Sequence, residues 1–160
     1  MTSDDDILLD VQNLDVHLRS SSSATPVHVI RGVSFTVRRH QRLAIVGESG
    51  SGKSVTALSI LRLLDPGASR ITGRILMDGE DLLAMSPSEL RAFRGGRIAM
   101  IFQDPMTSLN PVARIGKQMT SAMRLHRDLD RRSARSEALR LLEAVQIPAA
   151  KDRLRTYPSE

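Results

Sequence analysis

A glycine-rich segment, AIVGESGSGKSVTAL at residues 44–58, carries residue types that bind phosphate groups. Gly47, four residues, and then Gly52, Lys53 and Ser54 match the pattern G-x-x-x-x-G-K-[ST] of a phosphate-binding loop. Glycines adopt backbone angles that other residues disfavour, so successive N–H groups can turn toward one anion. The lysine can then reach the outer phosphates of a nucleotide, while the serine hydroxyl can bind the accompanying Mg²⁺. The expected binding residues are Gly47, Glu48, Ser49, Gly50, Ser51, Gly52, Lys53, Ser54 and Val55, with Ser54 also a metal ligand.

The residues on either side of this loop predict how it is held in place. RLAIV, residues 42–46, is an apolar run typical of a buried strand, and SVTALSILRLL, residues 54–64, has the spacing of a helix. A helix that begins near Gly52 directs its positive end at a bound anion. The alternative is a glycine-rich turn without a ligand, but a strand before the loop and a helix after it favour phosphate binding.

The composition limits the class of protein. The chain has 160 residues, of which 41% are hydrophobic, and a formal net charge of +5. The absence of cysteine excludes disulfides and thiolate chemistry and fits a reducing compartment. The four histidines are too scattered to form a metal site by themselves. The acidic start MTSDDDILL is unlike a secretory signal, and no apolar run approaches the roughly 18 residues of a membrane span, so we expect a cytoplasmic protein.

Many basic residues lie in one segment that has helical periodicity. Such a segment can follow the backbone of a nucleic acid, but it is more often a solvated helix face. The chain has no Trp, one Tyr and three Phe, which leaves few side chains for stacking on bases. Nucleic acid is therefore not favoured as a partner. The arginines of this segment are Arg124, Arg127, Arg131, Arg132, Arg135 and Arg140.

Strand patterns account for much of the first 110 residues. Residues 7–14 alternate with a period near two, and residues 27–37 are expected to form paired strands around Gly32. A short strand is followed by an Asp78-Gly79 turn. RIAMIFQ, residues 97–103, indicates another buried strand.

Helix patterns follow. In SPSEL, Ser86 is expected to cap a short helix, with Pro87 at its first position and Glu89 completing a capping box. From Pro111 onward the periodicity is helical. The methionines of this region could form an adaptable docking surface, but their helical spacing favours core packing. One helix face carries Ile115, Met119, Ala122, Met123 and His126, and another carries Ala134, Ala138, Leu141, Leu142 and Val145.

The stretch IAMIFQDPMTSLNP, residues 98–111, narrows the function. An expected strand ends at Gln103, whose amide can bind Mg²⁺ or hold a water molecule, and turn-forming residues follow at once. A phosphate-binding loop alone also occurs in kinases, GTPases, helicases and transport ATPases. The N-K-x-D and D-x-x-G patterns that GTPases require are absent. Gln103 is the candidate catalytic residue and a second candidate metal ligand.

Four segments in this order resemble the ATP-binding subunits of ATP-binding cassette (ABC) importers, in the branch that transports dipeptides, oligopeptides or nickel. The segments are VGESGSGKS, GRILMDGEDL, MIFQDPMTSLNP and RLRTYPSE, and they span nearly the whole chain. The resemblance implies an α/β P-loop NTPase fold with an antiparallel β subdomain and a helical subdomain inserted after the glutamine loop. Residues 1–110 would then form the nucleotide-binding core and β subdomain with the Walker A and glutamine loops, and residues 111–160 the start of the helical subdomain.

The same resemblance implies an ATPase that uses ATP and Mg²⁺ and couples hydrolysis to the import of peptides or a related solute. Lys53 would contact the β and γ phosphates, Ser54 would bind Mg²⁺, and Gln103 would lie near the metal or the attacking water. The runner-up is a cassette ATPase that acts on DNA through the arginine-rich helix.

Partners follow from the resemblance as well. A second ATP-binding cassette, transmembrane permease subunits and, indirectly, a solute-binding protein are implied, with the chain peripheral on the cytoplasmic face of the inner membrane. Asp104 to Pro111, together with Met119 and Met123, is expected to form the surface that meets the membrane subunits.

The chain also departs from the family pattern. The family usually stacks adenine on an aromatic residue about 29 positions before the Walker lysine, where this chain has Ala24, and His28 is a possible substitute. His40 stands where a glycine is usual. The Walker B carboxylate, the catalytic glutamate, the signature motif and the switch histidine have no counterpart, so we expect the amino-terminal part of a longer subunit that binds ATP but does not hydrolyse it alone.

Overall fold

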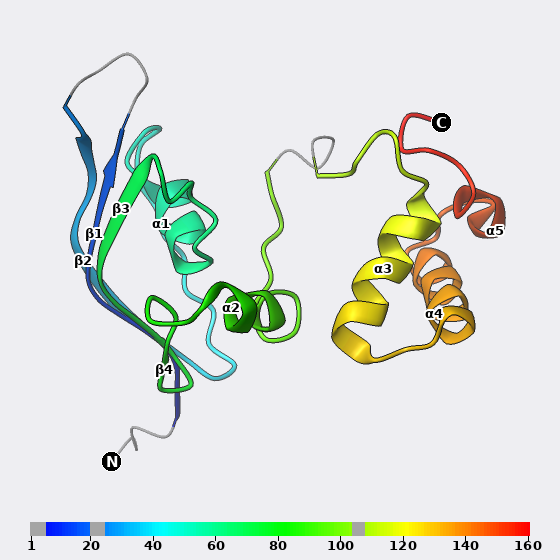
Figure 1. Cartoon of the computed structure of the whole chain (residues 1–160), viewed down its shortest axis with the longest axis horizontal. Coiled ribbons are helices and arrows are strands. Elements are labelled where there is room, and N and C mark those ends of the chain that lie inside the picture. The colour runs from blue at the N-terminus through cyan, green and yellow to red at the C-terminus, as the bar shows by residue number, and fades with distance from the viewer. Residues whose placement is uncertain (1–5, 20–24, 104–107) are drawn as a thin grey trace. The chain divides into compact units, whose positions relative to one another are not determined.

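The computed structural model describes residues 6–19, 25–103 and 108–160. By its contacts the chain divides into two compact units, Met1–Arg91 and Ala92–Glu160 (Figure 1). This contact boundary lies nearer the amino terminus than the 110/111 boundary expected from the change of periodicity. The functional division at residue 110 stays a prediction.

The first unit is built on a four-stranded antiparallel sheet with the order β2-β1-β3-β4 (Figure 1). The strands are β1 (Ile7–Leu18), β2 (Val27–Arg38), β3 (Ser69–Met77) and β4 (Glu80–Asp81). Val16 lies opposite Ile30 of β2, and Val11 lies opposite Ile75 of β3. These four side chains are buried, which places the apolar side of the alternating strand pattern in the core, as the sequence predicts for residues 7–14.

Residues 27–37 form one continuous strand, so the expected pair of strands around Gly32 is wrong. Gly32 has a φ of 59° and is an irregularity within β2 (Val27–Arg38) rather than a hairpin turn. Both halves of β2 pair with β1 (Ile7–Leu18), which is equally long, and register shifts absorb the irregularity. A long partner strand therefore overrides the local turn tendency of a glycine.

The predicted turn at Asp78 and Gly79 is confirmed. Both residues have positive φ, 49° and 81°, which is the conformation that a two-residue hairpin requires and that glycine adopts readily. Met77 pairs with Glu80 across the turn. The Arg39 guanidinium forms an ion pair with the Asp78 carboxylate.

The predicted capping box is also confirmed at α2 (Pro87–Phe93). The Ser86 N–H donates to Glu89 Oε2 over 2.8 Å, and the Ser86 hydroxyl donates to the same oxygen over 2.6 Å. The Ser86 hydroxyl bond is the main cause that lowers the pKa of Glu89. Pro87 occupies the first helical position, where a missing N–H is tolerated.

The two apolar runs expected as buried strands are not strands in the structure. Residues 42–46 have no strand assignment, and Val46 is 87% exposed. Ile101, in the run 97–103, is 96% exposed. A strand needs a hydrogen-bonding neighbour, and within the described residues neither run pairs with a strand. Ile98 of the second run forms only an isolated bridge with Arg94.

The second unit is helical, as predicted from residue 111 onward. It contains α3 (Ile115–Arg127), α4 (Arg131–Ala144) and α5 (Ala150–Arg153). The Asp130 carboxylate caps α4 by accepting from the Ser133 N–H over 2.6 Å, and this bond lowers the pKa of Asp130. The buried residues are Met123, Ala134, Ala138 and Leu154, with Met119, Leu129, Leu139, Leu141 and Leu142 packed against them.

The predicted helix faces are correct except at two positions. Ala122 is exposed although it was assigned to the apolar face of α3. Val145 is 67% exposed because α4 ends at Ala144 and the residue lies beyond the helix. Met123 is buried and Met119 packs on the core, so the choice of core packing for these side chains is confirmed. Burial of Met123 argues against its expected part in a docking surface, whereas Met119 is half-buried and its part in that surface stays a prediction.

Candidate nucleotide-binding site

The predicted phosphate-binding loop leads directly into α1 (Lys53–Ile60). Gly52 is the N-cap residue, with a φ of 93°, and Gly50 has a φ of 81°. These left-handed conformations favour glycine. A Cβ on Gly52 would also lie 2.5 Å from Ile30 Cδ1, but this side-chain end can shift, so the positive φ is the main reason for a glycine at this position.

The amino terminus of α1 is suited to a bound anion. Its first turn contains no acidic residue, so no carboxylate neutralises the positive end of the helix. The predicted loop residues Gly47 to Ser51 are exposed, as is Ser54 in the first turn, while Val55 is half-buried. N–H groups at the start of a helix have no partner within the helix and are available to phosphate oxygens.

The Lys53 side chain folds back over the loop. Its ammonium donates to the carbonyl oxygens of Gly47 and Glu48, over 2.7 Å each, and to the Ser51 hydroxyl over 3.3 Å. An ammonium has three donors, so the loop itself positions this charge above its own backbone. Ser51 N–H also donates to Glu48 O over 3.2 Å, which closes the turn of the loop.

Gln103 is exposed and belongs to the second unit, whereas the loop belongs to the first. The metal-binding and catalytic roles expected of Gln103 therefore stay predictions. Residues 104–107 of the neighbouring segment lie outside the described residues.

Gln118 hydrogen-bonds to the backbone at Asn110, in the described part of the segment 104–111. The sequence did not predict this role for Gln118. Its side-chain amide donates to Ala113 O over 2.7 Å and to Asn110 O over 3.0 Å, and its Oε1 accepts from the Asn110 N–H over 2.9 Å. Asn110 Oδ1 also accepts from the Val112 N–H over 3.0 Å. The sequence contains one signal for this role: Gln118 is a polar residue three positions after Ile115, and so lies close to the predicted apolar face of α3.

His28, the possible substitute for the missing adenine-stacking residue, already contacts other side chains in the structure. His28 stacks on His17 with ring centroids 4.0 Å apart and hydrogen-bonds to Asp15 Oδ1 over 2.5 Å, so its ring already has partners. Ala24 lies outside the described residues. His40 has a φ of 62°, the left-handed conformation that explains why a glycine is usual at this position.

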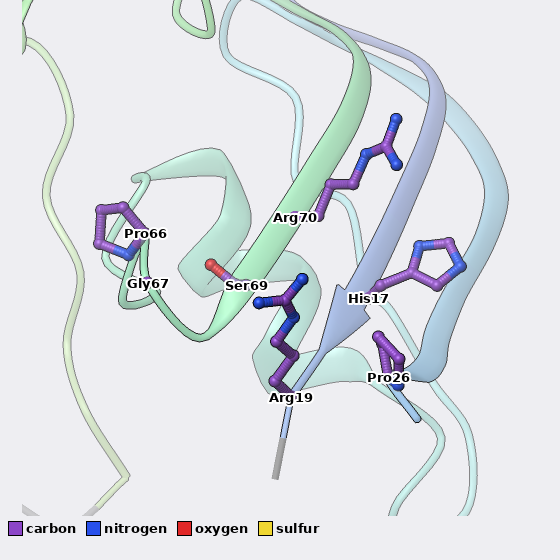
Figure 2. Close-up of a pocket in the computed structure, with 7 residues that line it drawn as sticks. All are labelled: His17, Arg19, Pro26, Pro66, Gly67, Ser69 and Arg70. Carbon is purple, nitrogen blue, oxygen red and sulfur yellow. The ribbon is translucent and has the colours of Figure 1, made fainter. Parts of the chain in front are cut away.

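A cavity of about 290 Å³, which the sequence did not predict, lies near the end of β1 and the start of β2 (Figure 2). Pairing of Leu18 with Ser69 brings the start of β3 to this end, and Figure 2 shows the Arg19 side chain beside Ser69. The lining residues are His17, Arg19, Pro26, Pro66, Gly67, Ser69 and Arg70. No periodic pattern links them, since they come together only through strand pairing.

Comparison with solved structures supports the fold. A dimeric ATP-binding cassette bound to ADP and phosphate is similar with a TM-score of 0.77, at 18% identity, over 95% of this chain and 62% of the cassette. At this identity the likeness shows the fold alone. The predicted fold class, an α/β P-loop NTPase with an antiparallel β subdomain and part of a helical subdomain, is thereby confirmed.

Sequence relatives and a family model identify the family. The dipeptide transport ATP-binding protein DppD of Bacillus subtilis is 45% identical over 96% of this chain and 45% of its own length. A Brucella abortus relative that carries the name of a peptide import ATP-binding protein is 48% identical over 94% of this chain. The chain spans about 45% of the length of these relatives. Because the family model described as ABC transporter matches residues 30–160, the chain belongs to the ABC transporter family.

Proposed function

We propose that the protein containing this chain binds MgATP at residues 47–55 and couples its hydrolysis to the import of peptides across the cytoplasmic membrane. The observation that carries the ATP site is the Lys53 ammonium held within the glycine loop at an unneutralised helix end. The peptide substrate rests on relatives at 45–48% identity that are named for peptide or dipeptide transport.

Within this proposal the backbone of the loop, the Lys53 side chain and the Ser54 side chain have different roles. Backbone N–H groups of residues 47–55 hold the phosphates, and Lys53 transfers its hydrogen bonds from the loop carbonyls to the β and γ phosphate oxygens. Ser54 is exposed in the first turn of α1, where its hydroxyl fits a metal ligand. The Mg²⁺ ion neutralises charge on the β and γ phosphates when it is bound.

Gln103 is proposed to orient water or metal once the complete site has formed. A phosphoryl-transfer site works mainly by positioning and electrostatics, so an amide that holds water is sufficient for such a role. The proposed partners are a second cassette and permease subunits, with a solute-binding protein acting indirectly. None of the helices in the described part of the chain has the length and hydropathy that a membrane crossing requires.

Replacing Ser54 should separate the contribution of the metal from that of the phosphates. We expect Ser54→Ala to lose most of the gain in ATP affinity that Mg²⁺ provides, while affinity in EDTA stays close to that of the parent chain. Ser54→Thr keeps the hydroxyl and should retain the gain. Titrations of ATP with and without Mg²⁺ test this, and an unchanged Mg²⁺ effect in Ser54→Ala would remove the serine from the metal site.

The transport function is tested on the complete transporter in membrane vesicles. We expect ATP-dependent uptake of a labelled dipeptide, and we expect Lys53→Ala to abolish it while the assembly and its permease subunits remain intact. ATP-dependent binding of DNA fragments is measured in parallel. DNA binding without dipeptide uptake would favour the alternative of a cassette ATPase acting on DNA.

A further inference from the structure

A groove of about 470 Å³ in the second unit is lined by side chains of one sign of charge. Its lining comes from α3, the start of α4 and the residues after α5. Six of the ten lining residues are Lys or Arg, and none is Asp or Glu. The basic ones are Arg114, Lys117, Arg124, Arg131, Arg135 and Arg155, and the others are Gly116, Thr120, Ser121 and Leu154.

Helical spacing explains how these charges come together. Lys117 and Arg124 are seven residues apart on α3, which places them on one face two turns apart. Arg131 and Arg135 are one turn apart at the start of α4. The Gly116 N–H donates to Leu154 O over 3.0 Å and so holds the segment with Arg155 against α3.

The groove holds an uncompensated excess of positive charge. Residues 111–160 contain eleven Lys and Arg against six Asp and Glu, an excess of five that equals the formal charge of +5 of the whole chain. None of the six basic groove residues forms a salt bridge within the part of the chain that the structure describes. The positive charges of these side chains repel one another, so a bound anion that carries several negative charges would stabilise the groove.

The other arginines of the same helices form a contrasting surface. Glu137 Oε2 accepts from Arg140 Nε over 2.7 Å, and Glu137 Oε1 lies 3.3 Å from Arg127 Nη1. The hydrogen bond from Arg140 is the main cause that lowers the pKa of Glu137. The arginine-rich segment is therefore not a uniform solvated face. Arg127 and Arg140 share the Glu137 carboxylate, whereas the arginines of the groove do not.

The chemistry of the groove selects the kind of anion. The hydroxyls of Thr120 and Ser121 donate to the carbonyls of Gly116 and Lys117, over 2.7 Å each, so the donors left for a ligand are guanidinium and ammonium groups. Guanidinium groups bind phosphate through paired hydrogen bonds. No aromatic side chain lines the groove, so it offers no stacking surface for a base.

We propose that this groove binds the phosphate groups of a multiply charged anion. Two sources have this chemistry: the headgroups of anionic phospholipids at a membrane surface, and a soluble polyphosphate. None of the residues that line the groove belongs to the loop at residues 47–55. Binding here adds a phosphate-sensing or membrane-contacting surface to the helical unit.

Two variants of equal charge test the proposal. Arg124→Gln/Arg131→Gln/Arg135→Gln removes three charges from the groove. The matched control, Arg127→Gln/Arg132→Gln/Arg140→Gln, removes three charges from the same two helices outside it. Glutamine preserves helix propensity, and far-UV circular dichroism of both variants equal to that of the parent chain establishes that the helices are intact.

The first arm measures binding of the 160-residue chain to vesicles of phosphatidylcholine with and without phosphatidylglycerol. The second arm measures binding of tripolyphosphate by calorimetry, with Lys53→Ala added to every protein so that the glycine loop does not contribute. In at least one arm we expect the groove variant to lose about 100-fold in affinity and the control no more than about threefold.

The outcomes separate the two sources and decide the proposal. Groove-dependent binding to phosphatidylglycerol vesicles identifies lipid headgroups, and groove-dependent binding of tripolyphosphate alone identifies a soluble ligand. Equal losses in both variants would show that net charge alone matters and would overturn the proposal. No groove-dependent loss in either arm would overturn it as well.

Discussion

Replacing Lys53 by alanine should lower the affinity of the chain for MgATP by roughly 10- to 150-fold, the largest binding effect expected of any single side chain here. The ammonium donates three hydrogen bonds within the loop, to two carbonyls and to the Ser51 hydroxyl, and these donors are those that we propose pass to the phosphate oxygens. A hydrogen bond to a charged group is worth about 1.5–3 kcal/mol, which gives this range of affinity. Calorimetric titration of ATP in the presence of Mg²⁺ measures the change.

Two further variants make the result specific. Lys151→Ala removes the same charge from an exposed position in α5 and should leave ATP affinity unchanged. Lys53→Arg keeps the charge but replaces a compact ammonium by a planar fork, which does not fit the close arrangement of three oxygen acceptors. We expect it to bind almost as weakly as Lys53→Ala. Equal affinities of the parent and Lys53→Ala would remove Lys53 from the proposed site.

Features set by a few neighbouring residues could be predicted from the sequence. The Asp78-Gly79 turn, the capping box at Ser86 and the helix that begins at Lys53 all appear as expected. Each depends on a local conformational preference that acts within about four residues: positive φ at a hairpin, a hydroxyl at a helix start, a glycine before a helix.

Features set by distant partners could not. The runs 42–46 and 97–103 have strand-like sequences, but a strand forms only with a neighbour, and the described chain supplies none. The division of the arginines into a groove set and a Glu137 set depends on how α3 and α4 pack, which a one-dimensional pattern of charge does not contain.

Replacing Gly73 by alanine should produce the largest loss of stability of any glycine substitution in the sheet. Gly73 lies in β3 with a φ of 102°, opposite the irregular part of β1 around Asn13, whose own φ is 47°. A Cβ at this position would lie 2.6 Å from Gln12 O and 2.8 Å from the Asn13 carbonyl carbon, with the Asn13 oxygen also in its way. Backbone atoms in a paired strand cannot move aside as a flexible side chain can.

Gly79→Ala is the matched control for this prediction. Gly79 also has a positive φ, 81°, but a Cβ there would meet no atom within 4 Å. We expect backbone strain alone to destabilise Gly79→Ala by about 1–2 kcal/mol. Strain and overpacking together should destabilise Gly73→Ala by about 3–5 kcal/mol, a large part of the stability of a small domain.

Hydrogen exchange followed by mass spectrometry locates the effect of both variants. Peptides from β1 (Ile7–Leu18) and β3 (Ser69–Met77) should lose protection in Gly73→Ala far more than in Gly79→Ala, while peptides from α3 (Ile115–Arg127) and α4 (Arg131–Ala144) keep theirs. If Gly73→Ala is too unstable to purify, solubility of Gly79→Ala under the same conditions still distinguishes the two mechanisms. Equal loss of protection in the two variants would mean that left-handed backbone strain, and not the contact with β1, decides the requirement for glycine.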